Sequence, residues 1–184
     1  MLFRSKVYVS DAQTLENIYT SIELLGKITG KNDEATAMVS GMKNTFSKIE
    51  NDVRLAGYGA DATPRSVYFE ASSWENSFWT AGSGVYMDDV AQALGLTNIF
   101  ADLTLWPSVS AEQIIERNPN FIVATAMYGE ESPVKEVLAR QSWEGISAVK
   151  NEDVFYVDNF SIPGPRIADA AMALYKLIYE NEAA

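Results

Sequence analysis

The hydrophobic positions in the first third of the chain recur at helical spacing. In residues 11–31 the apolar stripe ends at two glycines and consists of Leu15, Ile18, Ile22 and Leu25. A longer stripe over residues 32–54 consists of Ala35, Met38, Val39, Met42, Phe46, Ile49 and Val53. The β-branched and aromatic run KVYVS at 6–10 predicts a short strand ahead of both helices. We therefore expect residues 1–55 to form a short strand, a short helix and one long helix.

The pattern changes after the Gly-, Pro- and Asp-rich stretch AGYGADATPR at 56–65, which predicts a boundary. Beyond it, strand-like runs at 66–71, 97–101, 121–126 and 153–158 alternate with helical runs at 84–96, 110–118, 132–140 and 165–183. This alternation is typical of a mostly parallel sheet covered by helices on both faces. We therefore expect residues 66–184 to form one three-layer α/β/α lobe.

Composition excludes several classes of function. The 184 residues carry a net charge of −11 and contain neither Cys nor His. Without Cys and His there are no disulfides, thiolate zinc sites, cysteine nucleophiles or Ser-His-Asp triads. An acidic chain also repels the phosphates of nucleic acids. No stretch of the sequence approaches the length of a membrane span, and the first nine residues are too weakly apolar for a signal peptide.

Unusual residues gather in the loops that should follow the strands. In an open parallel sheet these loops share one edge, where ligands bind. Aromatic side chains with a few polar neighbours are typical of a small-molecule site, although any single aromatic is equally well explained by packing beneath a long loop. Arg166 is predicted either to pair with a ligand carboxylate or catecholate, or to stabilise the start of the last helix. The residues that we expect to line the site are Trp74, Trp79, Thr80, Trp106, Tyr128, Phe160 and Arg166.

The stretch SAEQIIERN predicts a capped helix with an acidic first turn. Ser110 and Gln113 have the spacing of a capping box, and Glu112 lies where a carboxylate interacts favourably with the helix dipole. Neither Asp88-Asp89 nor Glu130-Glu131 has the spacing of a metal site.

Four stretches resemble the C-terminal portion of ABC-transporter substrate-binding proteins for iron–siderophore, haem and cobalamin uptake. In that family a long, rigid backbone helix joins two α/β lobes, and the ligand lies between them. The stretches are TLENIYTSIELLGKITGKNDEATAMVSGM, FWTAGSGVYMDDVAQALGLTNIF, WPSVSAEQIIERNPNFIVAT and PGPRIADAAMALYKLIY. The resemblance implies that the chain corresponds to the backbone helix and one lobe, without the N-terminal lobe.

The resemblance also implies a function outside the cytoplasm, with no catalytic activity and no cofactor of its own. The protein would bind a ferric siderophore or similar iron complex and deliver it to a membrane permease. Cobalamin is the close alternative, and haem is less favoured without His, although Tyr128 could ligate iron. Glu112 would pair with arginines of the permease. With half of the ligand site missing, we expect weak binding and possible self-association through the aromatic wall.

Two other classes stay open. A Rossmann-like enzyme needs a Gly-rich phosphate turn after its first strand, and the sequence EASSWENSFW offers none after SVYF. In a protein-interaction module, the exposed aromatics would instead contact a protein partner.

Overall fold

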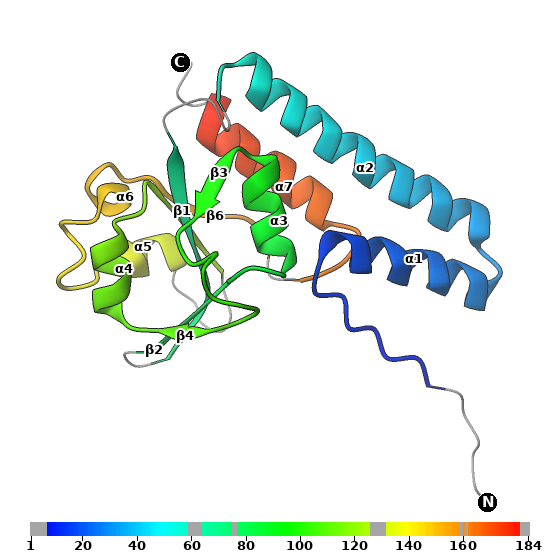
Figure 1. Ribbon diagram of the computed structural model, residues 1–184, viewed down its shortest axis with the longest axis horizontal. Helices are drawn as coiled ribbons and strands as arrows, with labels where there is room; N and C mark the ends of the chain where they lie inside the picture. Colours follow the sequence, from blue (N-terminus) through cyan, green and yellow to red (C-terminus); the bar gives the residue numbers. More distant parts are fainter. Residues whose placement is uncertain are drawn as a thin grey trace, which may run out of the picture.

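The computed structural model describes residues 7–58, 64–74, 77–125, 132–158, 160 and 162–180 (Figure 1). A helical hairpin lies against one side of an α/β lobe, and an extended N-terminal segment leads into the first helix of this hairpin.

The hairpin consists of α1 (Leu15–Thr29) and α2 (Asn32–Leu55). Thr14 and Asn17 form a capping box at the start of α1, and Gly30 ends it in the left-handed conformation at φ 71°. Gly26 permits the close approach of the two helices, because a Cβ there would lie 2.5 Å from the Cβ of Ala35. The long helix predicted over 32–54 is therefore confirmed.

The strand predicted at 6–10 is wrong for residues 7–10, which lie outside every helix and strand. Their side chains are exposed, and no backbone ladder pairs them with another described segment. A strand needs such a ladder, whatever the β propensity of Val and Tyr.

The sheet has six strands in the order β4-β2-β1-β5-β6, with β3 also paired to β1. They are β1 (Arg65–Trp74), β2 (Ser77–Thr80), β3 (Leu96–Asn98), β4 (Ser108–Val109), β5 (Phe121–Ala124) and β6 (Val154–Tyr156). β1 runs parallel to β3 and β5, and β5 runs parallel to β6, which confirms the mostly parallel sheet. β2 and β4 extend it in the antiparallel sense, in a region predicted to be loop.

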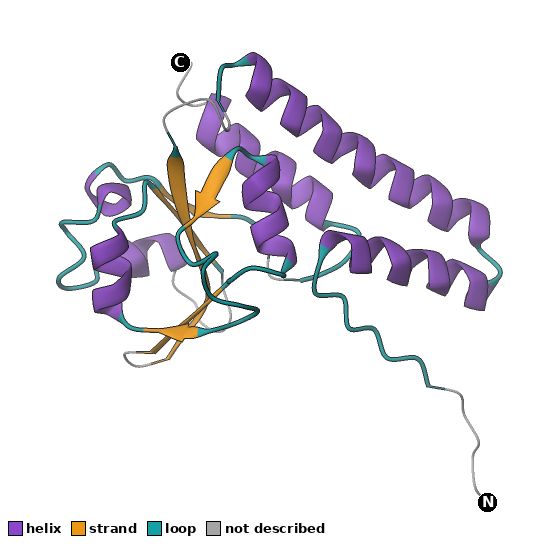
Figure 2. Ribbon diagram, viewed as in Figure 1, coloured by secondary structure: helices purple, strands orange, loops and turns teal. Residues whose placement is uncertain are grey.

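Helices cover both faces of the sheet (Figure 2). On one face α2 packs with α3 (Tyr86–Ala93) and α7 (Ile167–Tyr175), which continues as the π-helix η1 (Lys176–Glu180). The other face carries α4 (Ala111–Arg117), α5 (Pro133–Leu138) and α6 (Ser147–Lys150). Strand β1 supplies both cores by alternation, since Phe69 joins the first cluster and Tyr68 the second.

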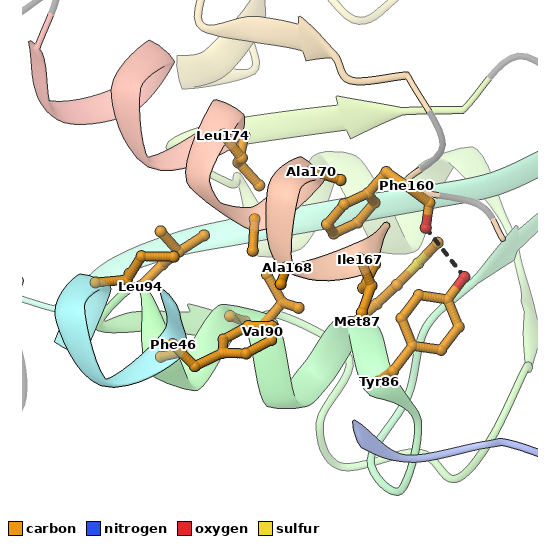
Figure 3. Close-up of a cluster of buried hydrophobic side chains, with 14 of the residues drawn as sticks. Phe46, Tyr86, Met87, Val90, Leu94, Phe160, Ile167, Ala168, Ala170 and Leu174 are labelled. Atoms are coloured by element: carbon orange, nitrogen blue, oxygen red, sulfur yellow. Dashed lines mark hydrogen bonds between the residues drawn. The ribbon is translucent and has the colours of Figure 1, made fainter. Parts of the chain in front are cut away.

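The larger core fixes the end of α3 that borders the candidate site. The side chains of α3 and α7 pack against one another on one face of the sheet (Figure 3). The Tyr86 hydroxyl donates a hydrogen bond of 3.1 Å to the carbonyl oxygen of Phe160, whose ring stacks on Phe69 at 5.6 Å. Burying large apolar side chains of this kind contributes about 1.5–3 kcal/mol each, so this end of α3 is firmly held.

Candidate functional site

A pocket of about 460 Å³ opens where the N-terminal segment meets the β1–β2 hairpin and the start of α3. Its wall combines aromatic rings with small polar side chains, the usual composition of a small-molecule site. The lining residues are Ser10, Asp11, Ala12, Gln13, Ala71, Ser72, Trp79, Tyr86, Met87, Trp106 and Pro163.

The antiparallel hairpin presents Trp79 to this pocket. Trp79 lies opposite Ser72 on β1 and Ser108 on β4, and its side chain is 46% exposed. Its neighbour Phe78 points to the opposite face and is buried, as strand alternation requires.

Trp106 is positioned by two interlaced loops. The amide of Gly82 donates to the carbonyl of Leu105 at 2.7 Å, and the amide of Leu105 donates back to Ser83 at 2.9 Å. Leu105 adopts φ 57°, and the backbone of Leu103 passes so close that a Cβ on Gly82 would lie 2.6 Å from its oxygen. The segment before α4 is therefore fixed against the loop that follows β2.

Gln13 ties the N-terminal segment to the aromatic wall. Its side-chain oxygen accepts a hydrogen bond from the Trp106 indole N–H at 2.8 Å, and its backbone oxygen accepts one from the Tyr86 amide at 2.6 Å. Its side-chain amide donates to Oδ1 of Asp11 at 2.7 Å. The Trp106 and Tyr86 rings lie 5.8 Å apart. Burial raises the pKa of the Tyr86 hydroxyl, which therefore stays neutral at physiological pH.

The structure brings only part of the predicted site together. Trp79 and Trp106 both line the pocket, as expected. Tyr128 and the side chain of Trp74 lie outside the described residues. Arg166 is exposed, caps the N-terminus of α7 with its backbone and is not among the described lining residues.

Two predicted lining residues need correction. Phe160 and Thr80 are both 0% exposed, so neither reaches the pocket in this structure. Phe160 belongs to the core beneath α7, and the Thr80 hydroxyl donates to the carbonyl of Phe69 at 2.8 Å. A buried hydroxyl needs such a partner, which makes Thr80 a structural residue of the hairpin.

Sequence reasoning missed Asp11, Gln13, Tyr86 and Met87. The sequence pattern includes Asp11 and Gln13 in the helical stretch at 11–31, and Tyr86 and Met87 in the helical run at 84–96. No local signal shows that residues 10–13 dock on the lobe, because that contact joins segments more than 70 residues apart.

A second pocket of about 330 Å³ lies on the Phe78 face of the β1–β2 hairpin, and its lining residues differ in chemistry from those of the first pocket. There Arg140 donates to both carboxylate oxygens of Glu70, with Nη2 2.7 Å from Oε1, and also to Glu136 at 3.0 Å. Its guanidinium lies over the rings of Phe78 and Trp143, at 5.0 and 4.7 Å from their centroids. The charges that line this second pocket are therefore already paired.

The helix beside the second pocket carries Glu112. Ser110 and Gln113 form the predicted capping box, and Glu112 lies exposed in the first turn of α4. The Ser110 hydroxyl lowers the pKa of Glu112 by hydrogen bonding to its carboxylate. Within the described residues, no cluster of three or more acidic side chains has the geometry to hold a metal ion, and no helix is long and apolar enough to cross a membrane.

Comparisons with known proteins agree with the fold and with the resemblance. Residues 5–159 match the model of the periplasmic binding protein family. An uncharacterized ABC transporter substrate-binding lipoprotein of Bacillus subtilis, YvrC, is 30% identical over 94% of this chain and 53% of its own length. A vitamin B12-binding protein of Photorhabdus laumondii is 26% identical over 97% of this chain and 60% of its own length. The chain thus spans between half and two thirds of these relatives.

Solved structures show the same arrangement. A possible iron-binding periplasmic solute-binding protein of Staphylococcus epidermidis superposes with a TM-score of 0.77 at 32% identity, over 94% of this chain and 66% of that one. A periplasmic vitamin B12 binding protein of Vibrio cholerae shares the fold with a TM-score of 0.72 at 20% identity, over 97% of this chain and 67% of that one. The chain belongs to the periplasmic binding protein family.

Proposed function

We propose that this protein is a substrate-binding component of an ABC importer and that the pocket beside Trp79 is its share of the ligand site. The protein carries out no catalysis in this role; it holds a bulky metal chelate and presents it to a permease. In this role the protein acts outside the cytoplasm. The B. subtilis relative, which is described as a lipoprotein, supports this location.

The observation that carries the proposal is the exposed indole of Trp79 beside Trp106 in an open pocket. Trp79 is 46% exposed, so a ligand that covers it removes apolar surface from water. Each Å² removed makes the binding free energy more favourable by roughly 25 cal/mol. The rigid support from Gln13 and the Gly82 loop reduces the cost of ordering the wall on binding.

A ferric siderophore or a similar iron complex is the first candidate ligand. The S. epidermidis protein, described as possibly iron-binding, supports it. Cobalamin is the second candidate, and the vitamin B12-binding proteins among the relatives support it. The corrin ring of cobalamin and the apolar ligand backbone around a ferric siderophore both offer apolar surface that suits a wall of two indoles.

Intrinsic fluorescence tests the proposal directly, because Trp79 and Trp106 belong to the wall. A neutral ferric trihydroxamate or cyanocobalamin should quench the emission saturably, and Trp79→Ala should weaken binding at least tenfold. Tyr156→Ala is the matched control, since Tyr156 is 39% exposed but lies on β6, outside this pocket. Unchanged binding in Trp79→Ala, or an equal loss in both variants, would show that the ligand binds elsewhere.

Docking of the permease is tested separately through Glu112. Its exposed, ionised carboxylate suits an arginine on a partner surface. In the importing cell, Glu112→Lys should leave chelate affinity intact but reduce uptake at saturating ligand. Glu116→Lys on the same helix controls for a general change of charge, and equal uptake in the two variants would exclude a specific role for Glu112.

A further inference from the structure

The described wall of the ligand pocket carries an acid and no base. Among the lining residues, Asp11 is the only one with a formal charge. The remaining polar groups are neutral: hydroxyls and an amide, which both donate and accept, and the indole N–H groups of Trp79 and Trp106, which only donate. The expected cation, Arg166, lies outside the described lining, so the wall as a whole is negative.

Asp11 is held in place while one of its oxygens stays available. Oδ1 accepts from the Gln13 side-chain amide at 2.7 Å, and the backbone oxygen of Asp11 accepts from the Gln13 amide at 3.2 Å. Oδ2 makes no hydrogen bond to any residue that the structure describes. Gln13 also accepts from the indole of Trp106, so the carboxylate and the aromatic wall form one connected unit.

A chelate that covers Trp79 and Trp106 also removes water from Asp11. An N–H or O–H donor of the chelate then gains a charge-assisted hydrogen bond to Oδ2. A carboxylate or catecholate of the chelate meets the like charge of Asp11 instead. At a separation of about 7 Å and an effective dielectric constant of about 30, this repulsion lowers affinity on the order of tenfold.

We propose that Asp11 makes this wall selective for bulky chelates that present N–H or O–H donors and no negative charge toward it. The carboxamides of a corrinoid and a neutral ferric hydroxamate meet this requirement, whereas ferric catecholates and haem propionates do not. The inference rests on the proposed function, and it replaces the expected pairing of a ligand carboxylate with Arg166.

The experiment titrates the protein with cyanocobalamin, a neutral ferric trihydroxamate and a trianionic ferric tricatecholate, followed by tryptophan fluorescence. The wild type should bind at least one neutral chelate more tightly than the catecholate. Asp11→Asn keeps the oxygen that accepts from Gln13, and it should raise catecholate affinity on the order of tenfold. Comparing cyanocobalamin with the trihydroxamate shows which of the two uncharged chelates, a corrinoid or a ferric hydroxamate, the pocket binds.

Asp33→Asn is the matched control, because Asp33 is an exposed acid in the first turn of α2 and does not line the pocket. It should leave the preference unchanged. An unchanged preference in Asp11→Asn overturns the inference. So does a loss of tight catecholate binding in Arg166→Gln, which would place charge recognition at Arg166. If no chelate binds at all, both the proposed function and this inference fail. If the chelates bind but Asp11→Asn does not change their relative affinities, only this inference fails.

Discussion

The two sides of the β1–β2 hairpin differ in whether their charged groups are paired within the protein. On the side of Phe78, the guanidinium of Arg140 is paired with Glu70 and Glu136 and covered by aromatic rings. On the side of Trp79, a similar aromatic surface stands open, and the carboxylate of Asp11 keeps one oxygen without a described partner. Residues 78 and 79 are adjacent in sequence, so alternation along one short strand separates the two environments.

The difference shows why pocket volume alone does not identify a ligand site. The pockets measure about 330 and 460 Å³, values too similar to choose between them. The Phe78 side already satisfies its charges internally, so a ligand there would have to break a buried ion pair. The Trp79 side offers apolar area and an acceptor at no such cost. This contrast supports the proposal that the Trp79 side binds the ligand, whereas the Phe78 side contributes to stability.

Removing Glu70 should have the largest effect, and it should affect stability alone. The side chains of Arg140 and Glu70 are only 14% and 5% exposed. Glu70→Ala leaves a buried cation without its main partner, which typically costs about 3–5 kcal/mol of unfolding free energy. Urea denaturation measures the loss. Glu136→Ala removes the 58% exposed partner of the same arginine and should cost under about 1 kcal/mol. Equal losses would mean that the buried pair contributes no more than the exposed one.

Gly82→Ala should act on the Trp79 side through the backbone. The added Cβ would lie 2.6 Å from the oxygen of Leu103 and 2.8 Å from its carbonyl carbon, so the loop that carries Trp106 must shift. Such overpacking typically costs about 1–3 kcal/mol. Chelate affinity should fall together with stability. Gly41→Ala is the control, since its Cβ meets nothing within 4 Å in the interior of α2 and should stabilise the helix by about 0.5–1 kcal/mol. A stable Gly82→Ala variant with normal affinity would contradict the tight contact between the loops.

How much the sequence could predict depended on whether an element forms by local or distant contacts. The long helix over 32–54, the capping box at Ser110 and the buried strand at 121–124 carry their own periodicity or capping residues, and all three are present. β2 and β4 were missed because two to four residues leave no period to recognise. β2 forms by antiparallel pairing with β1 in a tight hairpin, and β4 forms by antiparallel pairing with β2, which is distant in the sequence.

The candidate site follows the same rule. Trp79 and Trp106 were predicted because aromatic residues gather in the loops expected at one edge of the sheet, and both line the pocket. Phe160 shows the limit of that argument, since an aromatic in a loop at the right edge can still turn inward and join the core. Gln13 was missed because its role depends on docking against residues 86 and 106, which no local pattern reveals.

Replacing Gln13 should test whether the Trp79 side is preorganised. Gln13→Ala removes the acceptor of the half-buried Trp106 indole and the donor to Asp11. Water can replace part of these contacts, so we expect a loss of about 0.5–1.5 kcal/mol in stability. Chelate affinity should fall several-fold, because the wall must be ordered during binding. Calorimetric titration should show a less favourable binding entropy. Gln92→Ala, near the other end of α3 and outside the pocket lining, should not change affinity.

The smallest expected effect concerns Asp89, which joins the start of α1, in the helical hairpin, to the first turn of α3. Its Oδ2 accepts from the Leu15 amide at 2.8 Å, and burial raises its pKa above the ordinary 3.8, with Asp88 adding to the shift and the Leu15 bond opposing it. A carboxyl whose pKa is higher in the folded state binds protons more readily there than in the unfolded chain. Its ionisation therefore lowers stability as pH rises through the folded pKa, and this penalty disappears below the unfolded value.

Asp89→Asn keeps an oxygen for the Leu15 amide and removes the buried charge. At pH 7 the variant should match or exceed the wild type by a few tenths of a kcal/mol, because relief of desolvation competes with the lost attraction to the N-terminus of α3. The difference in urea midpoint should shrink as the pH falls toward 3.8, the ordinary pKa of an aspartate, because the wild-type carboxyl has a raised pKa and is then protonated in the folded state. A variant that is clearly less stable at pH 7, with the gap closing on acidification, would show that the ionised carboxylate stabilises the joint between hairpin and lobe. In that case the helical hairpin α1–α2 would be held to the lobe by charge as well as by packing.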